Sequence, residues 1–282
     1  MKLTQISLFF LILFTQVSCK KESSSPSSSF NKGNDPNFTI IQNTDANFLS
    51  FNKKVNVFGI DIYASPQSDD SRLLHAANLM AQYLDNDEDG VIDNQLVLDK
   101  MIENKAFMVF WKSESDLSSL TPPGDRMGQD LGNDETIPVW HTNGHTGTFD
   151  AALEEVWHII TNAGYAQAYP AVFGVNSGTE LANAMDIARG GHFTTIPNPY
   201  PANAWYSYDD QTCDYDCMTS EYIYWGMSSI LGAQENRLSE ISQEWKLNTN
   251  QLVKNTDQSL YSLLTNPIYK FPTVLPDGTY KH

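Results

Sequence analysis

A short stretch in the middle of the chain carries carboxylate and imidazole groups at helical spacing. Residues 151–164 read AALEEVWHIITNAG, and Glu154 and His158 lie four positions apart. Residues four apart lie on one face of a helix, so both side chains can point at one metal ion. Zinc accepts imidazole and carboxylate ligands alike. Glu155 lies beside the pair and could take a proton from a water molecule near such an ion.

A third ligand is predicted from a later apolar segment. Glu221 lies within CMTSEYIYWGMSSILGAQ (217–234), where it is the only acid. A carboxylate among apolar neighbours needs a partner. A zinc ion held by Glu154, His158 and Glu221 would keep one position open for water, as catalytic zinc sites do.

EEVWH resembles the H-E-x-x-H motif of zinc metallopeptidases, with Glu154 in place of the first histidine. In the gluzincin group of these enzymes, the third ligand is a glutamate on a later helix, and Glu221 fits that place. The order of elements over about residues 55–234 is also similar to the zincin layout. The resemblance implies a zincin-like α+β fold, with a small sheet packed on the motif helix and a mainly helical C-terminal half. It also implies peptide substrates and Glu155 as the general base.

The sequence departs from this family at a second place and leaves alternatives open. Trp225 stands four residues after Glu221, where many gluzincins have an aspartate. His141 and His145 precede the motif and could replace the missing histidine if the chain folds back. Otherwise EEVWH is an ordinary amphipathic helix whose histidine is half-buried and hydrogen-bonded.

An acidic loop at residues 85–93, DNDEDGVID, has the spacing of a calcium site. Carboxylates at loop positions 1, 3, 5 and 9, with glycine at position 6, suit the hard oxygen coordination of Ca²⁺. With two flanking helices the loop resembles an EF-hand, and its predicted ligands are Asp85, Asp87, Asp89 and Asp93. Leu96 occupies position 12, where a bidentate glutamate is usual, so we expect a weak structural site. The alternative is a solvated acidic turn that binds nothing.

The first residues predict export and a lipid anchor. An apolar run at 6–14 is too short to span a bilayer, which takes about 20 residues. Segment 1–18 is a predicted signal peptide that ends before Cys19. A cysteine at this position resembles the cleavage site of bacterial lipoproteins. The alternative is an ordinary secretory signal. The Ser/Pro-rich segment 19–36 is a predicted flexible tether. Lys20 directly after the cysteine favours the outer membrane or cell surface.

Composition narrows the classes of partner. The formal net charge of −17 argues against nucleic acid, because phosphate binding needs a basic surface. Cys213 and Cys217 could close a small disulfide loop in an oxidising compartment. If they lay on a regular helix, their geometry for a disulfide would be poor.

The elements that must position these groups follow from hydrophobic periodicity. We predict one α+β domain over residues 37–282, with the EF-hand-like part inserted at 71–104. Strands are expected at 55–63, 106–112 and 136–142, and loops at 113–135 and 194–212. Helices are expected at 71–84, 94–104, 149–163, 179–191, 217–234, 238–247 and 258–266.

Two functions are consistent with these features. The first is a surface-tethered, zinc-dependent metallopeptidase-like hydrolase, in which Tyr222 or His192 would stabilise the oxyanion. The second is a non-catalytic calcium-binding lipoprotein of the same fold that binds a partner or glycan through its many tyrosines and tryptophans.

Overall fold

The computed structural model describes residues 35–118 and 120–282. The predicted signal peptide, Cys19 and the tether up to residue 34 lie outside the described residues. Within the described ranges, no helix is long and apolar enough to cross a membrane.

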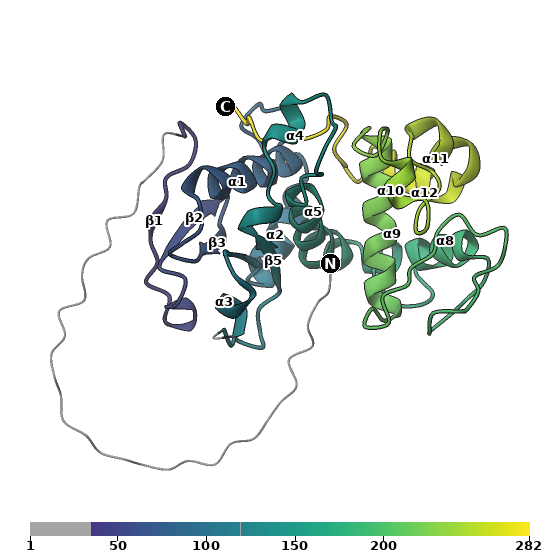
Figure 1. The fold of residues 1–282 in the computed structure, drawn as a ribbon, viewed down its shortest axis with the longest axis horizontal. Coiled ribbons are helices and arrows are strands. Elements are labelled where there is room, and N and C mark those ends of the chain that lie inside the picture. Colours follow the sequence, from purple (N-terminus) through teal and green to yellow (C-terminus); the bar gives the residue numbers. More distant parts are fainter. Residues whose placement is uncertain (1–34, 119) are drawn as a thin grey trace, which may run out of the picture.

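Five strands form one mixed sheet in chain order (Figure 1). β1 (Ile41–Gln42), β2 (Lys53–Val57) and β3 (Ile60–Ala64) are antiparallel neighbours. β4 (Phe107–Trp111) and β5 (Gly128–Gly132) run parallel to β3. With many helices packed beside this sheet, the chain belongs to the α+β class.

The strand predicted at 55–63 is a hairpin made of β2 and β3. Phe58 and Gly59 both have positive φ, at 50° and 98°, which places the turn between two short strands. The Asn56 side chain accepts a hydrogen bond from the Gly59 amide at 3.0 Å and fixes this turn. Asparagine and glycine are common in such turns because they tolerate local backbone bonding and positive φ.

The strand predicted at 106–112 is confirmed as β4, and its side chains alternate between two cores. Phe107 and Val109 pack with Phe48 and Tyr63 on one face. Met108 and Phe110 belong to the larger core, where the helices lie. This alternation follows from the two-residue repeat of a strand.

β5 was predicted as loop, and this prediction is wrong. Its sequence, GQDLG, lacks the branched and aromatic residues typical of strands. A Cβ atom on Gly128 would come 2.3 Å from the Phe107 ring, and one on Gly132 would come 2.9 Å from the Trp111 ring. Aromatic side chains of β4 therefore lie over the two glycines, and no other residue type fits there without displacing the rings.

The strand predicted at 136–142 is also wrong, because this segment follows a 3₁₀ turn (Asn133–Glu135) and contains the short helix α4 (Val139–Thr142). Pro138 starts α4 with φ −57°. The Ile137 amide donates a hydrogen bond to the Asp150 carboxylate, with an N···O distance of 2.7 Å. A side chain outside the segment thus satisfies a backbone group that strand pairing would otherwise have used.

Three helices of the first half agree with the predicted periodicity: α1 (Asp70–Leu84), α2 (Gln95–Glu103) and α5 (Ala152–Ile160). The short α3 (Glu114–Ser118), in contrast, lies in the segment 113–135 that was predicted as loop. A π-helical turn, Thr161–Tyr165, continues α5 into α6 (Ala166–Ala168). Gly164 lies in this turn, and a Cβ atom there would come 2.7 Å from the Val97 side chain of α2. The glycine therefore lets α2 pack closely against the end of α5.

The second half is mainly helical, as predicted. It comprises α7 (Pro170–Phe173), α8 (Glu180–Arg189), α9 (Tyr215–Ile230), α10 (Leu238–Ile241), α11 (Asn250–Thr256) and α12 (Gln258–Leu264). The helix predicted at 238–247 is only the single turn α10. In Figure 1, α9 stands between α5 and the other C-terminal helices.

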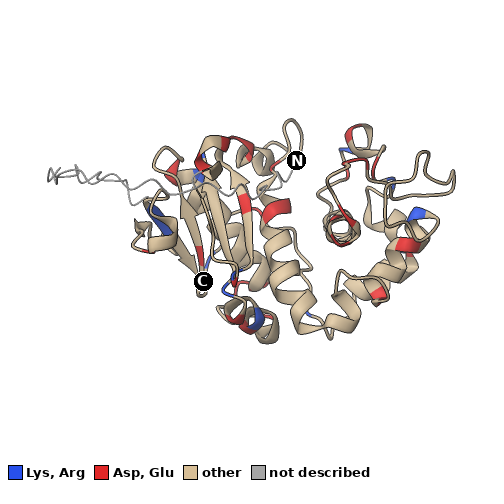
Figure 2. Cartoon of the chain, turned by 90° about the horizontal axis from the view of Figure 1, so that it is seen from below, with Lys and Arg blue, Asp and Glu red and all other residues tan. Residues whose placement is uncertain are grey.

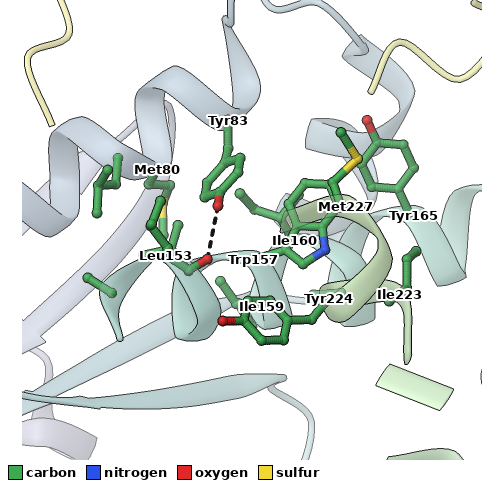
Figure 3. Packing of buried hydrophobic residues seen from close by; sticks show 14 of the residues in the cluster. Met80, Tyr83, Leu153, Trp157, Ile159, Ile160, Tyr165, Ile223, Tyr224 and Met227 are labelled. Carbon is green, nitrogen blue, oxygen red and sulfur yellow. Dashed lines mark hydrogen bonds between the residues drawn. The ribbon is translucent and has the colours of Figure 1, made fainter. Parts of the chain in front are cut away.

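The core between α1, α5 and α9 is rich in aromatic residues (Figure 3). Trp157 is 1% exposed and packs against Tyr83 and Tyr165. The Tyr83 hydroxyl donates to the Leu153 carbonyl at 3.0 Å, which joins α1 to α5. The helix that carries EEVWH is therefore fixed by packing on several sides.

Candidate metal centre

Two helices bring the three predicted zinc ligands together. Glu154 and His158 lie on one face of α5, and α9 packs against α5 and carries Glu221. The His158 Nε2 atom lies 3.8 Å from a Glu154 oxygen and 3.5 Å from a Glu221 oxygen. Their possible ligand atoms all lie within 4.8 Å of one another. The juxtaposition expected from the sequence is present.

The spacing of these atoms differs from that of a hydrogen-bonded cluster. Two ligands about 2.1 Å from a tetrahedral zinc ion lie about 3.4 Å apart, whereas N–H···O hydrogen bonds are at most about 3.2 Å long. His158 is 5% exposed, and neither of its ring nitrogens has a hydrogen-bond partner in the described part of the chain. Buried polar atoms are rarely unpaired, so this imidazole is suited to hold an ion.

Electrostatics at the centre favour a positive charge. Burial lowers the pKa of His158, but the charges of Glu221 and Glu154 outweigh burial and raise this pKa well above its usual value. Burial raises the pKa of Glu154, but the neighbouring His158 dominates and lowers it. A bound cation could take the place of the imidazolium proton between the carboxylates.

Glu155 is next to Glu154 in the sequence and lies beside the three candidate ligands. It is 4% exposed and accepts a 2.5 Å hydrogen bond from the Gln129 side chain of β5. Burial, together with the charges of Glu154 and Glu221, raises the pKa of Glu155 well above its usual value. A raised pKa is what a carboxylate needs to accept a proton near neutral pH.

A cleft of about 570 Å³ borders the centre at Glu154, the one candidate ligand among its lining residues. Both Glu154 and Glu155 line it, which gives a substrate a route to these residues. On its far side Arg237 stacks over the Phe149 ring, 3.7 Å from the ring centre, and donates to Gln234 and Glu240. The cleft is lined by Gly147, Thr148, Phe149, Ala151, Glu154, Glu155, Arg237 and Glu240.

Neither residue predicted to stabilise the oxyanion lines this cleft. The Tyr222 hydroxyl is fully buried and donates to Asp257 at 2.6 Å. His192 is half exposed and pairs with Asp186 at 2.7 Å. Arg237 is the cationic side chain that faces the cleft instead.

His141 is in a second buried cluster and not among the three ligands. His75 and His141 both donate from Nε2 to one Asp150 oxygen, at 2.7 and 2.8 Å. Because a carboxylate can only accept, both rings carry a proton on Nε2. These bonds lower the pKa of Asp150 well below its usual value, despite the opposing effect of burial. The cluster is thus held together by hydrogen bonds to Asp150, although the Nδ1 atom of His141 has no partner in the described chain and the three side chains are close enough to hold a metal ion. His145 stacks on Trp140 nearby.

The acidic loop brings three of its four predicted ligands together. Oxygens of Asp85, Asp87 and Asp89 lie within 4.8 Å of one another. Gly90 has φ +83°, the sharp turn expected at position 6. Asp85 is fully buried and accepts from the amides of Asp89 and Gly90 and from the Tyr280 hydroxyl.

Asp93 lies outside that group of three. Its carboxylate accepts from the Asn86 amide at 2.7 Å and so closes the loop. Burial and the charges of Asp87 and Asp85 raise the pKa of Asp93. Leu96 is 44% exposed on α2, as expected of a residue that contributes no ligand. The C-terminal segment covers the loop through Tyr280.

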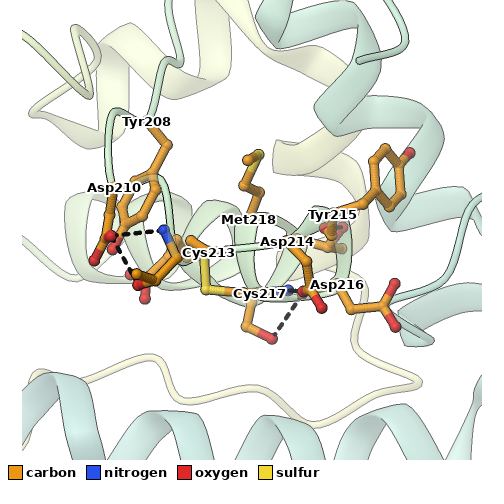
Figure 4. The surroundings of a disulfide bond; sticks show 12 residues. Tyr208, Asp210, Cys213, Asp214, Tyr215, Asp216, Cys217 and Met218 are labelled. Atoms are coloured by element: carbon orange, nitrogen blue, oxygen red, sulfur yellow. Dashed lines mark hydrogen bonds between the residues drawn. A yellow bond between two sulfur atoms is a disulfide. The ribbon is translucent and has the colours of Figure 1, made fainter. Parts of the chain in front are cut away.

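The two cysteines are joined by a disulfide (Figure 4). Cys213 precedes α9 and only Cys217 lies on the helix, so the poor geometry of two helical cysteines does not arise. The Cα atoms are 5.3 Å apart. The bond attaches the end of the segment between α8 and α9 to α9.

Three polar residues near the centre were not predicted from the sequence. Gln129 lies in the unpredicted strand β5, and Arg237 precedes a single helical turn. Glu244 lies in the segment that was predicted as a longer helix. The negative charges of Glu221 and Glu154 help to raise its pKa. None of these residues belongs to a local motif, so no sequence signal connects them to EEVWH.

Glu244 should make the metal-free protein less stable as pH rises. Burial and the charge of Glu221 raise its pKa from 4.5 to about 7. Between these values the folded state holds more protons than the unfolded state, so stability falls as pH rises through this window. Because Glu244 is partly exposed, we expect only about 1–2 kcal/mol after allowing for solvent screening. In urea unfolding with chelator present, the wild type should lose this free energy of unfolding between pH 5 and pH 8. Glu244→Gln should not show this loss.

The exposed Glu180→Gln is the control for this comparison and should keep the wild-type pH dependence. An unchanged pH dependence in Glu244→Gln would contradict the assignment.

The acidic side chains are spread over many elements, and positive ones are fewer (Figure 2). No family model, curated protein or solved structure matches this chain. Its function therefore has to be inferred from the geometry of its own side chains.

Proposed function

We propose that this protein is a zinc-dependent hydrolase of the metallopeptidase type, with a zincin-like fold, tethered to the outer membrane or cell surface through Cys19. One observation carries the proposal. His158 is buried between Glu154 and Glu221 with both ring nitrogens unpartnered within the described ranges, at separations that suit ligands of one ion.

The chemistry of the donor set fits zinc. One imidazole and two carboxylates are accepted zinc ligands, and three protein ligands are the usual number in catalytic sites. Zinc, when bound, supplies Lewis-acid polarisation of a carbonyl and lowers the pKa of a neighbouring water.

The surrounding side chains have distinct tasks in this proposal. Glu155 faces the same cleft as Glu154 and would accept the proton of the attacking water. Gln129 donates to the Glu155 carboxylate and holds its orientation. Arg237, fixed by Phe149 and Glu240, would stabilise negative charge that develops on a carbonyl oxygen in the cleft.

Zinc content and peptide hydrolysis test the proposal together. The purified mature domain should retain about one zinc ion per chain after dialysis and should cleave a quenched fluorescent peptide library. Chelator should stop cleavage, and added zinc should restore it. A protein that binds no zinc at micromolar concentrations of the ion would rule the proposal out.

The second candidate function is a non-catalytic calcium-binding lipoprotein that binds a partner or glycan. The convergence of Asp85, Asp87 and Asp89 around the sharp turn at Gly90 favours calcium binding. A structural calcium ion is also compatible with the hydrolase.

Millimolar Ca²⁺ should raise the melting temperature. Binding to the folded state alone stabilises it by about 1.4 kcal/mol at ten times the dissociation constant, which is about 3–6 °C for a domain of this size. Asp87→Ala should remove the shift because it deletes an exposed ligand without disturbing the buried Asp85. Differential scanning calorimetry with and without Ca²⁺ measures this.

Asp99→Asn on the exposed face of the neighbouring α2 is the matched control and should keep the full shift. If Ca²⁺ leaves all three melting curves unchanged, the loop is only an acidic turn.

A further inference from the structure

Arg189, the last residue of α8, is a buried cation without an acceptor. It is 0% exposed, and neither Nε, Nη1 nor Nη2 has a hydrogen-bond partner in the described chain. A guanidinium carries five N–H donors and stays charged in proteins. Burying such a group unpaired is unfavourable, so the position calls for an anion.

The aspartate that could have paired with Arg189 has other partners. Asp186 lies one helical turn earlier on α8, a spacing that allows an ion pair within a helix. One oxygen of Asp186 accepts from the Tyr215 hydroxyl at 3.0 Å, and the other pairs with His192 at 2.7 Å. The guanidinium is therefore left to an acceptor from outside the helix.

Three aromatic rings surround the guanidinium. Its carbon lies 5.5 Å from the ring centre of Phe193, 5.8 Å from that of Tyr200 and 5.9 Å from that of Tyr215. Aromatic faces stabilise a cation, but they accept no conventional hydrogen bonds. The rings hold the group in place and leave its N–H edges unsatisfied.

Two other arginines in the described chain have the carboxylate partner that Arg189 lacks. Arg126 lies over the Phe48 ring and also binds the Asp45 carboxylate at 2.8 Å. Arg237 lies over Phe149 and binds Glu240 at 3.1 Å. Each of these combines an aromatic ring with a carboxylate, whereas Arg189 has the rings alone.

We propose that Arg189 and the rings of Phe193, Tyr200 and Tyr215 form a binding site for the carboxylate group of a ligand. A carboxylate is planar and pairs with a guanidinium through two parallel hydrogen bonds, which suits a group with rings around it. Phe193 and Tyr200 come from the segment between α8 and α9, so the site can open by movement of this segment while both helices stay folded. The site does not depend on the proposed hydrolase activity.

Titration of the purified mature domain with sodium acetate tests this, followed by melting temperature and by calorimetry. Sodium chloride at matched ionic strength corrects for general salt effects, and sodium phosphate tests a tetrahedral anion. A blocked dipeptide with a free C-terminal carboxylate and the same dipeptide as its amide distinguish a peptide source from a small acid. We expect a dose-dependent rise in melting temperature with acetate, with the peptide acid, or with both, but not with the amide.

Variants connect the response to the residue. Arg189→Met should abolish the carboxylate response. Because it removes an unpaired buried charge, it should melt no lower than the wild type when no ligand is present. Arg189→Lys should weaken binding at least tenfold, because an ammonium lacks the planar fork. Arg126→Met is the control: it breaks an existing pair and should lower the melting temperature while keeping the response.

Two kinds of result would overturn the proposal. The first is a carboxylate response that is absent, or equal in the wild type and Arg189→Met. The second is a response to phosphate alone. If Arg189→Met is too unstable to purify, the proposal is tested by Arg189→Lys and by the acetate, phosphate and dipeptide titrations of the wild type.

Discussion

Glu155→Gln should abolish peptide hydrolysis and leave the zinc content unchanged. The amide keeps the size of the side chain but cannot accept a proton, and a lost general base typically costs about 10²–10⁴-fold in rate. His158→Ala should instead lose zinc and activity together, because it removes the ligand between Glu154 and Glu221. Metal analysis and single-turnover peptide cleavage on the same samples separate the two effects.

The exposed Glu180→Gln is the control and should match the wild type in both assays. Glu154→His should tighten zinc binding, since it restores the usual ligand pair of the motif. Cleavage that survives unchanged in Glu155→Gln would remove this residue from the mechanism while leaving the zinc site standing. A wild type and a Glu154→His variant that both lack zinc would remove the site itself.

Asp150→Ala should destabilise the fold by about 3–5 kcal/mol, because it removes a buried charged acceptor and leaves its hydrogen-bond donors unpaired. Asp150 is fully buried and joins three parts of the structure, because it accepts from His75 on α1, His141 on α4 and the Ile137 amide. Its removal leaves all three donors without an acceptor. Urea unfolding followed by circular dichroism measures the change.

Asp99→Ala on the exposed surface should change stability by no more than about 0.5 kcal/mol. A similarly small effect of Asp150→Ala would show that water replaces the carboxylate and that the network adds little. Asp150 comes just before α5, so losing its hydrogen bonds should also change the orientation of Glu154.

The elements that sequence periodicity predicted well are those with a wide apolar face. The helix at 71–84 corresponds to α1, the strand at 106–112 to β4, and the apolar segment around Glu221 to α9. In each case local pattern and tertiary packing favour the same structure, so no information from distant residues is needed.

The failures have a common physical cause, which is that the deciding partner is distant in sequence. β5 is a strand because its backbone pairs with β4 and its glycines lie under Phe107 and Trp111. In segment 136–142, Asp150 accepts a hydrogen bond from the Ile137 amide just before α4. Neither interaction is visible in a window of neighbouring residues.

The residues of the candidate site also fall into two groups: those that a local sequence pattern predicted and those that depend on the fold. Glu154 and His158 share a helix face, so their proximity follows from spacing alone. Glu221 was found because a lone acid in an apolar helix needs a partner. Gln129 and Arg237 have no such local anomaly, and only the folded arrangement connects them with Glu155.

The different exposure of the three proposed ligands has a kinetic consequence. Glu154 is 24% exposed at its side chain and faces the cleft, whereas His158 is 7% and Glu221 11% exposed. Eight of the nine residues of α5 are buried, so its amides should exchange with deuterium only in rare, large-scale openings. A metal ion would then enter through rotation of the Glu154 side chain, a motion that needs no opening of α5. The site would load rapidly on a backbone that does not rearrange.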